Sequence, residues 1–355
     1  MRKIRVFQEY NVDLGQLYNW LPWGGLIYPQ VVRNKDGSLM GFIRYSGDTA
    51  KGAPYGHPTD EVEGLEFTKG WAVWSECWHY DGRNELTLTL CWNPFRDKNS
   101  GLIVNGMTDG GLSPQLAELH FQEILTQLCQ VLSEVECEAH ILQNEEVLQY
   151  LAQTLTGEPS SQEMYVPPLY LDAVLSRDVR FQVYGAGTEK KNDLAIGGRD
   201  LTVVTPLGQS KVSVMYTLFE AFADLDYRFV RRFLFCDEAG AEKSLDGYMS
   251  SWCKGRSTLK AFMRGQLLGE LNGLFAETFV FRFAEEERDE REAQVESAFR
   301  SLGLPHVFEN YNRKHCWWGT LPGCFRANLP PQVTGLDSLA ELLIGGEQPV
   351  QAESL

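Results

Sequence analysis

The most constraining feature of this sequence is a pair of extended segments joined by an Asp-Gly step. Residues 71–80 lead into Asp81-Gly82, and residues 85–92 follow. An Asp-Gly step between extended runs is a strong hairpin signal. In the second run apolar side chains alternate with Thr and Cys, and the apolar set is Leu86, Leu88, Leu90 and Trp92. This alternation predicts a half-buried strand with one apolar face, in a hairpin of an antiparallel sheet.

Similar turns and changes of period along the chain define a fold class. Asp36-Gly37 separates the extended runs 31–33 and 39–45. At Ser113 the period becomes helical, because Ser113 can cap a helix, Pro114 suits a first turn and apolar residues then share one stripe. Other predicted strands are 138–142, 201–204, 227–236 and 277–283, and other predicted helices are 144–155, 212–223, 241–271 and 285–302. We expect an α+β fold with mixed, mostly antiparallel sheets and packed helices.

The length of the chain suggests more than one folding unit. With 355 residues and about 150 residues per domain, two or three units are expected. The Gly157 to Ser161 segment is the best boundary, since it is rich in turn-forming residues. We therefore predict a β-rich, then helical subdomain at 1–157, a second α+β subdomain at 162–345 and a flexible tail at 346–355. No internal repeat of fixed period is present, although strand–helix–strand units recur in both halves.

Charge and hydropathy narrow the class of protein. The formal charge is 32 − 48 = −16, which argues against nucleic acid as a direct partner, because wrapping a phosphate backbone needs a clustered basic surface. The longest mostly apolar stretch, 21–32, is interrupted by Pro and Gly and is shorter than the roughly 20 residues that span a bilayer. Polar residues interrupt any signal-peptide core after the basic N-terminus. We expect a cytoplasmic chain without a transmembrane segment.

Motifs for catalysis, cofactors or metals do not stand out. The chain has no GxxxxGKS/T phosphate loop, and Gly185-Ala186-Gly187 lacks the third Gly and the periodic helix of a dinucleotide fingerprint. The six His and eight Cys show no pair of pairs at zinc-site spacing, so we expect buried free thiols and no metal or cofactor site. Two alternatives stay open. A free-standing hydrolase would use a Cys/His pair such as His315-Cys316, and an accessory nucleic-acid-binding protein would use basic clusters at 228–232 and 254–264.

Five short segments, taken in order along the chain, resemble segments of one protein family. The first joins Leu21-Pro22-Trp23 to the Asn34–Ser38 turn. The others are Leu86–Leu90, Tyr170–Leu175, Tyr227–Leu234 and Leu321–Asn328. They resemble, in family order, the N-terminal region of the CagE/TrbE/VirB family of conjugal transfer and type IV secretion ATPases. The chain departs from the family in lacking a helix before Trp71 and in having Pro330-Pro331 in place of the usual Arg of the closing element.

The resemblance implies a docking and assembly role. In that family the N-terminal region attaches the motor to the inner-membrane complex and to neighbouring subunits, and a C-terminal half hydrolyses ATP. The motor half is expected to be missing here, as in a shortened chain, a split gene or a reduced paralogue, so ATP and Mg²⁺ would be ligands of that half only and no catalytic residue carries over. The implied partners are inner-membrane type IV secretion components, other copies and the motor half. The implied location is cytoplasmic, or peripheral at the inner face of the cell membrane.

Two surfaces are predicted to bind partners. One is the turn formed by Leu21, Pro22 and Trp23, where aromatic and proline side chains come together. The other is the strand that carries Arg228, Arg231 and Arg232. Local basic and aromatic patches of this kind would let an acidic chain meet its partners.

Overall fold

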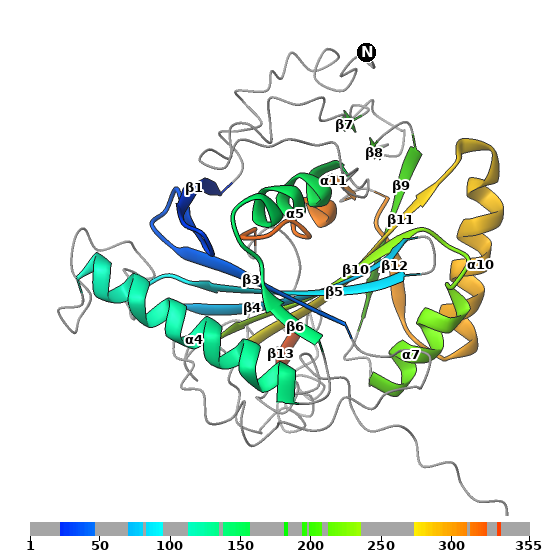
Figure 1. Cartoon of the computed structure of the whole chain (residues 1–355). Coiled ribbons are helices and arrows are strands. Elements are labelled where there is room, and N and C mark those ends of the chain that lie inside the picture. Colours follow the sequence, from blue (N-terminus) through cyan, green and yellow to red (C-terminus); the bar gives the residue numbers. More distant parts are fainter. Residues whose placement is uncertain are drawn as a thin grey trace, which may run out of the picture.

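The computed structural model describes a set of ranges that together form one sheet with helices on both faces (Figure 1). These ranges are 22–46, 70–80, 83–94, 113–134, 138–156, 181–183, 194–196, 199–207, 212–235, 273–310, 313–324 and 332–334. All strand pairs within them are antiparallel. The predicted α+β class, with mostly antiparallel sheet and packed helices, is therefore confirmed.

The first half of the chain contributes one side of the sheet. Its strands are β1 (Trp23–Tyr28), β2 (Val31–Asn34), β3 (Leu39–Ser46), β4 (Trp71–Tyr80), β5 (Arg83–Trp92) and β6 (Glu138–Ile141), and its helices are α4 (Pro114–Glu134) and α5 (Glu145–Thr156). The two predicted hairpins are present, since β2 pairs with β3 and β4 pairs with β5. At the open end of the β4–β5 hairpin, the rings of Trp71 and Trp92 stack with centroids 4.7 Å apart.

The second half contributes the other side. Its strands are β7 (Phe181–Val183), β8 (Leu194–Ile196), β9 (Arg199–Pro206), β10 (Tyr227–Phe235), β11 (Gly273–Phe283), β12 (His306–Phe308) and β13 (Gln332–Thr334). Its helices are α7 (Val212–Ala221), the 3-10 turn η2 (Glu285–Glu287), α10 (Arg288–Ser301) and α11 (Arg313–Trp318). The predicted helix 241–271 and the resembling segment Tyr170–Leu175 lie outside the described residues.

The strand order repeats itself from the two edges of the sheet inward. From one edge it is β1-β2-β3-β5-β4, and from the other it is β7-β8-β9-β11-β10. β6 pairs with the end of β3 as β12 pairs with the end of β9. In chain order β6 lies between α4 and α5, and β12 lies between α10 and α11. The two halves therefore share one topology, related by a pseudo-twofold axis between β4 and β10. Within the described ranges, α7 and β13 have no counterpart in the first half.

The two halves join through the central pair of strands. β4 and β10 run antiparallel in continuous register from Tyr227 opposite His79 to Leu234 opposite Ala72. The division into two subdomains stays a prediction, because the sheet is continuous across the described ranges and the segment from Gly157 to Ser161 lies outside them. The subdomain limits at 157, 162 and 345 also stay a prediction.

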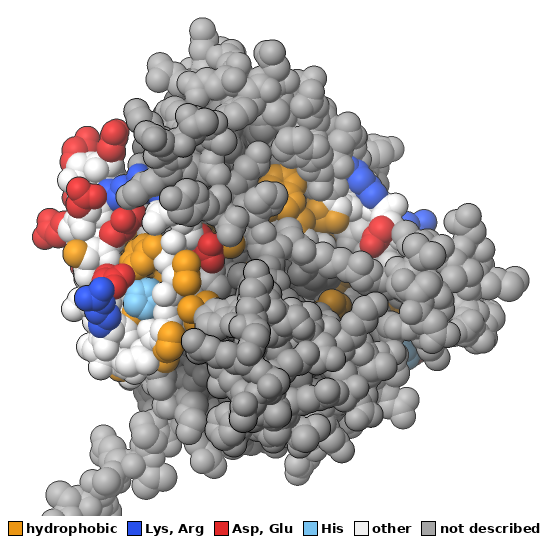
Figure 2. Space-filling model, turned by 180° about the vertical axis from the view of Figure 1, so that it is seen from behind, with side chains coloured by type: hydrophobic (Ala, Val, Ile, Leu, Met, Phe, Trp, Pro, Cys, Tyr) orange, Lys and Arg blue, Asp and Glu red, His pale blue; other side chains and the backbone are white. Residues whose placement is uncertain are grey.

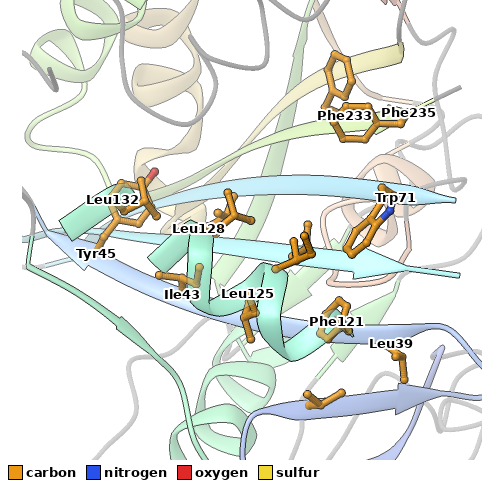
Figure 3. Packing of buried hydrophobic residues seen from close by; sticks show 14 residues of the cluster. Leu39, Ile43, Tyr45, Trp71, Phe121, Leu125, Leu128, Leu132, Phe233 and Phe235 are labelled. Atoms are coloured by element: carbon orange, nitrogen blue, oxygen red, sulfur yellow. The ribbon is translucent and has the colours of Figure 1, made fainter. Parts of the chain in front are cut away.

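One face of the sheet carries α4 on the first half and α7 and α10 on the second. Figure 3 shows Phe121, Leu125, Leu128 and Leu132 of α4 turned towards the strands, where they form one hydrophobic cluster with residues of β3, β4, β5 and β10. Gly41 on β3 allows this close approach, because a Cβ there would lie 2.7 Å from Leu125 Cδ2. Each fully buried side chain of this size contributes about 1.5–3 kcal/mol, so the face is a major source of stability.

A second cluster on the same face is mostly aromatic. Leu218 of α7, Phe222 directly after that helix, and Val295 and Phe299 of α10 pack against the phenylalanines of β10 and β11. The Phe222 ring meets the Phe281 ring edge-on, with centroids 5.1 Å apart and an interplanar angle of 88°. This arrangement explains the predicted alternation of Phe residues on β11, which puts them on one face of a strand.

The opposite face carries α5 and α11, which lie next to one another above the middle of the sheet in Figure 1. Phe42 of β3 points to this face, whereas its neighbour Ile43 belongs to the cluster under α4. The Phe42 ring meets the ring of Tyr150 on α5 edge-on at 5.1 Å. Of the helices in the described ranges, none combines the length and apolar content that crossing a bilayer requires.

The central β4–β10 pairing predicts that the halves stay together after the chain is cut between them. A specific protease site inserted between Gly157 and Ser161 should give two fragments that elute as one species in native gel filtration, and separate in urea. The reason is that the paired strands bury backbone hydrogen bonds and share one hydrophobic cluster. Fragments that separate without denaturant would contradict a continuous sheet.

Candidate functional site

The candidate site is centred on β10, the strand that carries Arg228, Arg231 and Arg232. Because β4 and β11 pair with its two edges, β10 is an interior strand. The three arginines are only 4%, 7% and 4% exposed. Buried arginines are rare unless their guanidinium groups are paired, so their partners define what this region does.

Arg228 reaches the ends of two elements at once. Its NH1 donates to the backbone carbonyl oxygen of Thr154 at 2.9 Å, in the last turn of α5. Its NH2 donates to the hydroxyl of Thr320, just after α11. The Thr320 hydroxyl in turn donates to the carbonyl oxygen of Trp317 at 2.6 Å. One guanidinium therefore connects the C-terminal ends of α5 and α11.

Arg232, further along β10, bonds to the same loop. Its NH1 donates to the carbonyl oxygen of Gly319 at 2.7 Å, and its NH2 contacts the Thr278 hydroxyl of β11 at 3.3 Å. Burial lowers the pKa of Arg232 to about 10, although Cys316 and Cys324 act in the opposite direction. The group therefore stays charged at neutral pH.

These contacts give hydrogen-bond donors to carbonyl groups at the ends of α5 and α11. The last carbonyl groups of an α-helix have no partner within it, and cations near them are favoured by the helix dipole. The last turn of α5 has no basic residue. Arg228 supplies the missing donor from a different part of the chain, and Arg232 does the same after α11. We call Arg228, Arg232, Thr154, Gly319 and Thr320 the arginine clamp.

Arg231 belongs to the other face of the sheet. Its Nε donates to Oε1 of Glu277 at 2.7 Å, directly across the strand pair from β10 to β11. The Glu277 side chain is 1% exposed and that of Arg231 is 9% exposed. Arg231 also lies over the ring of Phe229, with Cζ 5.4 Å from its centroid. The pair lies between the two hydrophobic clusters, since Phe229 belongs to one and Phe233 to the other.

The chain at the start of β1 packs against the loop that follows α11. The indole Nε1 of Trp23 donates to the carbonyl oxygen of Pro322 at 2.8 Å. The backbone N–H of Lys35 donates to the carbonyl oxygen of Pro22 at 2.7 Å. Gly323 has a φ of 81° and lies so close that a Cβ would be 2.9 Å from Cγ of Pro22. Only glycine fits there without strain or displacement.

The β2–β3 turn is fixed by its own side chains. The Nδ2 of Asn34 donates to the Ser38 hydroxyl at 2.9 Å, and that hydroxyl donates to Oδ1 of Asp36 at 2.6 Å. The Asp36 Oδ1 also accepts the backbone N–H of Ser38 at 3.0 Å. This network explains why Asp-Gly forms the turn here, because the aspartate bonds to the backbone two residues on.

The predicted partner-binding residues are thus internal rather than on open surfaces. Trp23 is 1% exposed, the three arginines are buried, Pro22 is half-buried, and Leu21 lies outside the described residues. The expectation that Trp23 and the arginines form exposed patches is wrong, because their polar groups bond to other parts of the same chain. A role of these residues in partner binding stays a prediction.

The buried thiols of the described residues are held in their protonated form. Burial raises the pKa of Cys91, Cys316 and Cys324 to about 12 each, and this disfavours a thiolate nucleophile at position 316. The thiols of the described cysteines are free, as predicted for those residues. Nowhere in the described ranges do three or more metal-ligating side chains come together.

Comparisons with known proteins identify no family for this chain. No protein-family model matches it, and no curated protein matches it. Among solved structures, it is similar to a Physcomitrella patens BBE-like 1 variant, with 8% identity and a TM-score of 0.35 over 91% of this chain and 56% of that chain. It is also similar to CrmK, a flavoenzyme involved in shunt product recycling in caerulomycin biosynthesis, with 12% identity and a TM-score of 0.30 over 75% of this chain and 42% of that chain. The chain thus spans about half the length of these proteins, and TM-scores below 0.5 carry no inference.

The clamp predicts that charge alone cannot replace Arg232. Arg232→Lys should lower the free energy of unfolding by about 1–3 kcal/mol, because a lysine cannot reach two separate acceptors with a planar fork. Urea denaturation monitored by tryptophan fluorescence measures this.

The matched control is Arg33→Lys. Arg33 pairs with Glu118 on the surface, and its side chain is 47% exposed, so its replacement should change stability by about 0.5 kcal/mol or less. If the two variants were equally stable, the claim that the arginine clamp stabilises the fold would be wrong.

Proposed function

We propose that this chain is a non-catalytic docking and assembly region of a conjugal transfer, or type IV secretion, ATPase. It would connect an ATP-hydrolysing motor to the inner-membrane complex. One observation supports this most: segments that separately resemble the family are neighbours in space. Trp23 bonds to Pro322, and Arg228 and Arg232 bond to the loop just before Leu321. Segments from the beginning, middle and end of the resemblance thus form one structural unit.

The chemistry of the described residues supports a binding role. The clamp arginines bond to helix ends, and Arg231 bonds to Glu277. The buried thiols have raised pKa values. These groups stabilise the fold, and none is arranged as an activated nucleophile. ATP and Mg²⁺ would be bound by the motor half, and this chain would contribute shape and contacts.

The proposed partners are the inner-membrane components of a type IV secretion system, other copies of this chain and the motor half. The proposed location is the cytoplasm, or the inner face of the cell membrane. Because the clamp arginines are interior, they would act on partners indirectly, by holding α5, α11 and the 319–324 loop in place. Contacts with partners would then come from the outer faces of the elements that the clamp positions.

Co-purification from cells that contain the cognate transfer system tests this proposal. The tagged full-length chain, recovered from detergent-solubilised membranes, should enrich inner-membrane secretion components and an ATPase motor identified by mass spectrometry. An unrelated tagged protein of similar net charge controls for ionic adsorption, since this chain carries a charge of −16.

The proposal also predicts how the purified chain responds to ATP. Calorimetry with Mg·ATP should show no binding to the chain alone. Tight ATP binding, or recovery of neither a motor nor any inner-membrane component, would overturn the assignment.

A further inference from the structure

His306 is the first residue of β12, and its side chain packs against α10. Its side chain is 8% exposed. The imidazole stacks on the Phe299 ring of α10 with centroids 4.6 Å apart and meets the Phe308 ring edge-on at 5.7 Å. A polar ring held between two aromatic rings needs partners for its nitrogens, because an unpaired buried polar atom is costly.

Both ring nitrogens face oxygen acceptors. Nδ1 lies 2.9 Å from the carbonyl oxygen of Leu304, which can only accept, so Nδ1 must carry a hydrogen. Nε2 lies 3.1 Å from Oε2 of Glu296 on α10. If that carboxylate is ionised, Nε2 must also carry a hydrogen, and the ring is then an imidazolium.

The surroundings of Glu296 favour the ionised carboxylate. Its other oxygen accepts from NH2 of Arg300 at 2.6 Å. The pKa of Glu296 is lowered, chiefly by the hydrogen bond from His306; burial, the next cause in size, raises it, and the charges of Arg300 and His306 lower it further. Opposite His306 on β9 stands Pro206, which has no charge. Within the described ranges, Glu296 is the carboxylate paired with this ring, and Arg300 is the cation beside it.

We propose that His306 and Glu296 form a proton-dependent clasp between α10 and β12. The clasp is closed when both ring nitrogens carry hydrogens. When Nε2 loses its proton, its lone pair faces the carboxylate oxygen, and the attraction becomes a repulsion. The inference is independent of the proposed function.

The position of the clasp gives it a structural consequence. β12 is held on β9 by a short pairing of His306–Phe308, continued by the backbone N–H of Glu309, which donates to the carbonyl oxygen of Val203 at 2.9 Å. The chain then enters α11 and the loop held by the arginine clamp. Opening of the clasp therefore loosens the edge strand that leads into the clamp. Figure 2 shows charged side chains of both signs on the flank where α10 lies, so solvent and protons have access to this helix.

The sign of the pH dependence follows from the two groups. Because the pKa of Glu296 is lowered from its ordinary value, its contribution to stability is present above that value and is lost as the pH falls through the lowered one. The other limit follows from the geometry, because the contact between Nε2 and Oε2 of Glu296 needs a hydrogen on Nε2. The clasp is thus strongest between these two limits.

Glu296→Gln in the full-length chain tests the clasp by reversing its preference. The glutamine amide donates to a neutral Nε2, so the variant favours the ring that has lost the proton. The melting temperature of the wild-type chain minus that of Glu296→Gln should be smaller at pH 9 than at pH 6, by about 2–4 °C. Glu290→Gln, at an exposed position of the same helix, should follow the wild-type chain.

The ring itself gives a second readout that needs no variant to fold. In the wild-type chain, the ¹⁵N shifts of His306 should be those of a ring protonated at both nitrogens at the pH where the wild-type chain is most stable relative to Glu296→Gln. They should be those of a ring protonated at Nδ1 alone at the pH where this advantage is lost. A ring that is neutral at both pH values, or parallel melting curves for the wild-type chain and Glu296→Gln, would overturn the clasp.

Discussion

The structure depends on guanidinium groups of an interior strand that complete the ends of two helices. Arg228 bonds to Thr154 at the end of α5 and to Thr320 after α11, and Arg232 bonds to Gly319. A carbonyl group at a helix end that is buried without a donor costs free energy, and the donors here come from the centre of the sheet. A charge buried in this way stabilises the fold only while all its partners are in place, so this interaction couples β10, α5 and the 319–324 loop.

The clamp lies where the two halves of a pseudo-symmetric sheet meet. β4 and β10 form the central pair, and α5 and α11 occupy corresponding places in the two halves on one face. On the other face lie two hydrophobic clusters, with Arg231 and Glu277 between them. The cluster under α4 includes Phe233 and Phe235 of β10, so it joins the halves together with the central strand pair and its arginines. Described parts of three of the segments that resemble the secretion ATPases are in contact near this junction, and our proposal of an assembly role rests on these contacts.

The sequence predicted local structure well and the long-range arrangement poorly, for physical reasons. The turn at Asp36-Gly37, the pairing of the two strands on either side of Asp81-Gly82 and the helix that begins at Pro114 depend on neighbouring residues, and the structure contains all three. The strand 227–236 was also predicted, and it is observed at 227–235. Burial of Arg228 and Arg232 was missed, because their partners are backbone carbonyls about 70–90 residues away, which no local pattern reveals. The available signal was three arginines in a strand of otherwise apolar and aromatic residues.

Hydrogen exchange measured by mass spectrometry on the wild-type chain and on Arg228→Lys tests the central claim most directly. The clamp predicts that peptides covering α5 and residues 313–324 both lose protection in the variant, because a lysine cannot bond to Thr154 and Thr320 together. Peptides covering α4, which the clamp does not contact, should exchange as in the wild-type chain. Unchanged protection of α5 and of residues 313–324 in a folded variant, or loss in only one of them, would contradict the claim that one guanidinium couples the two.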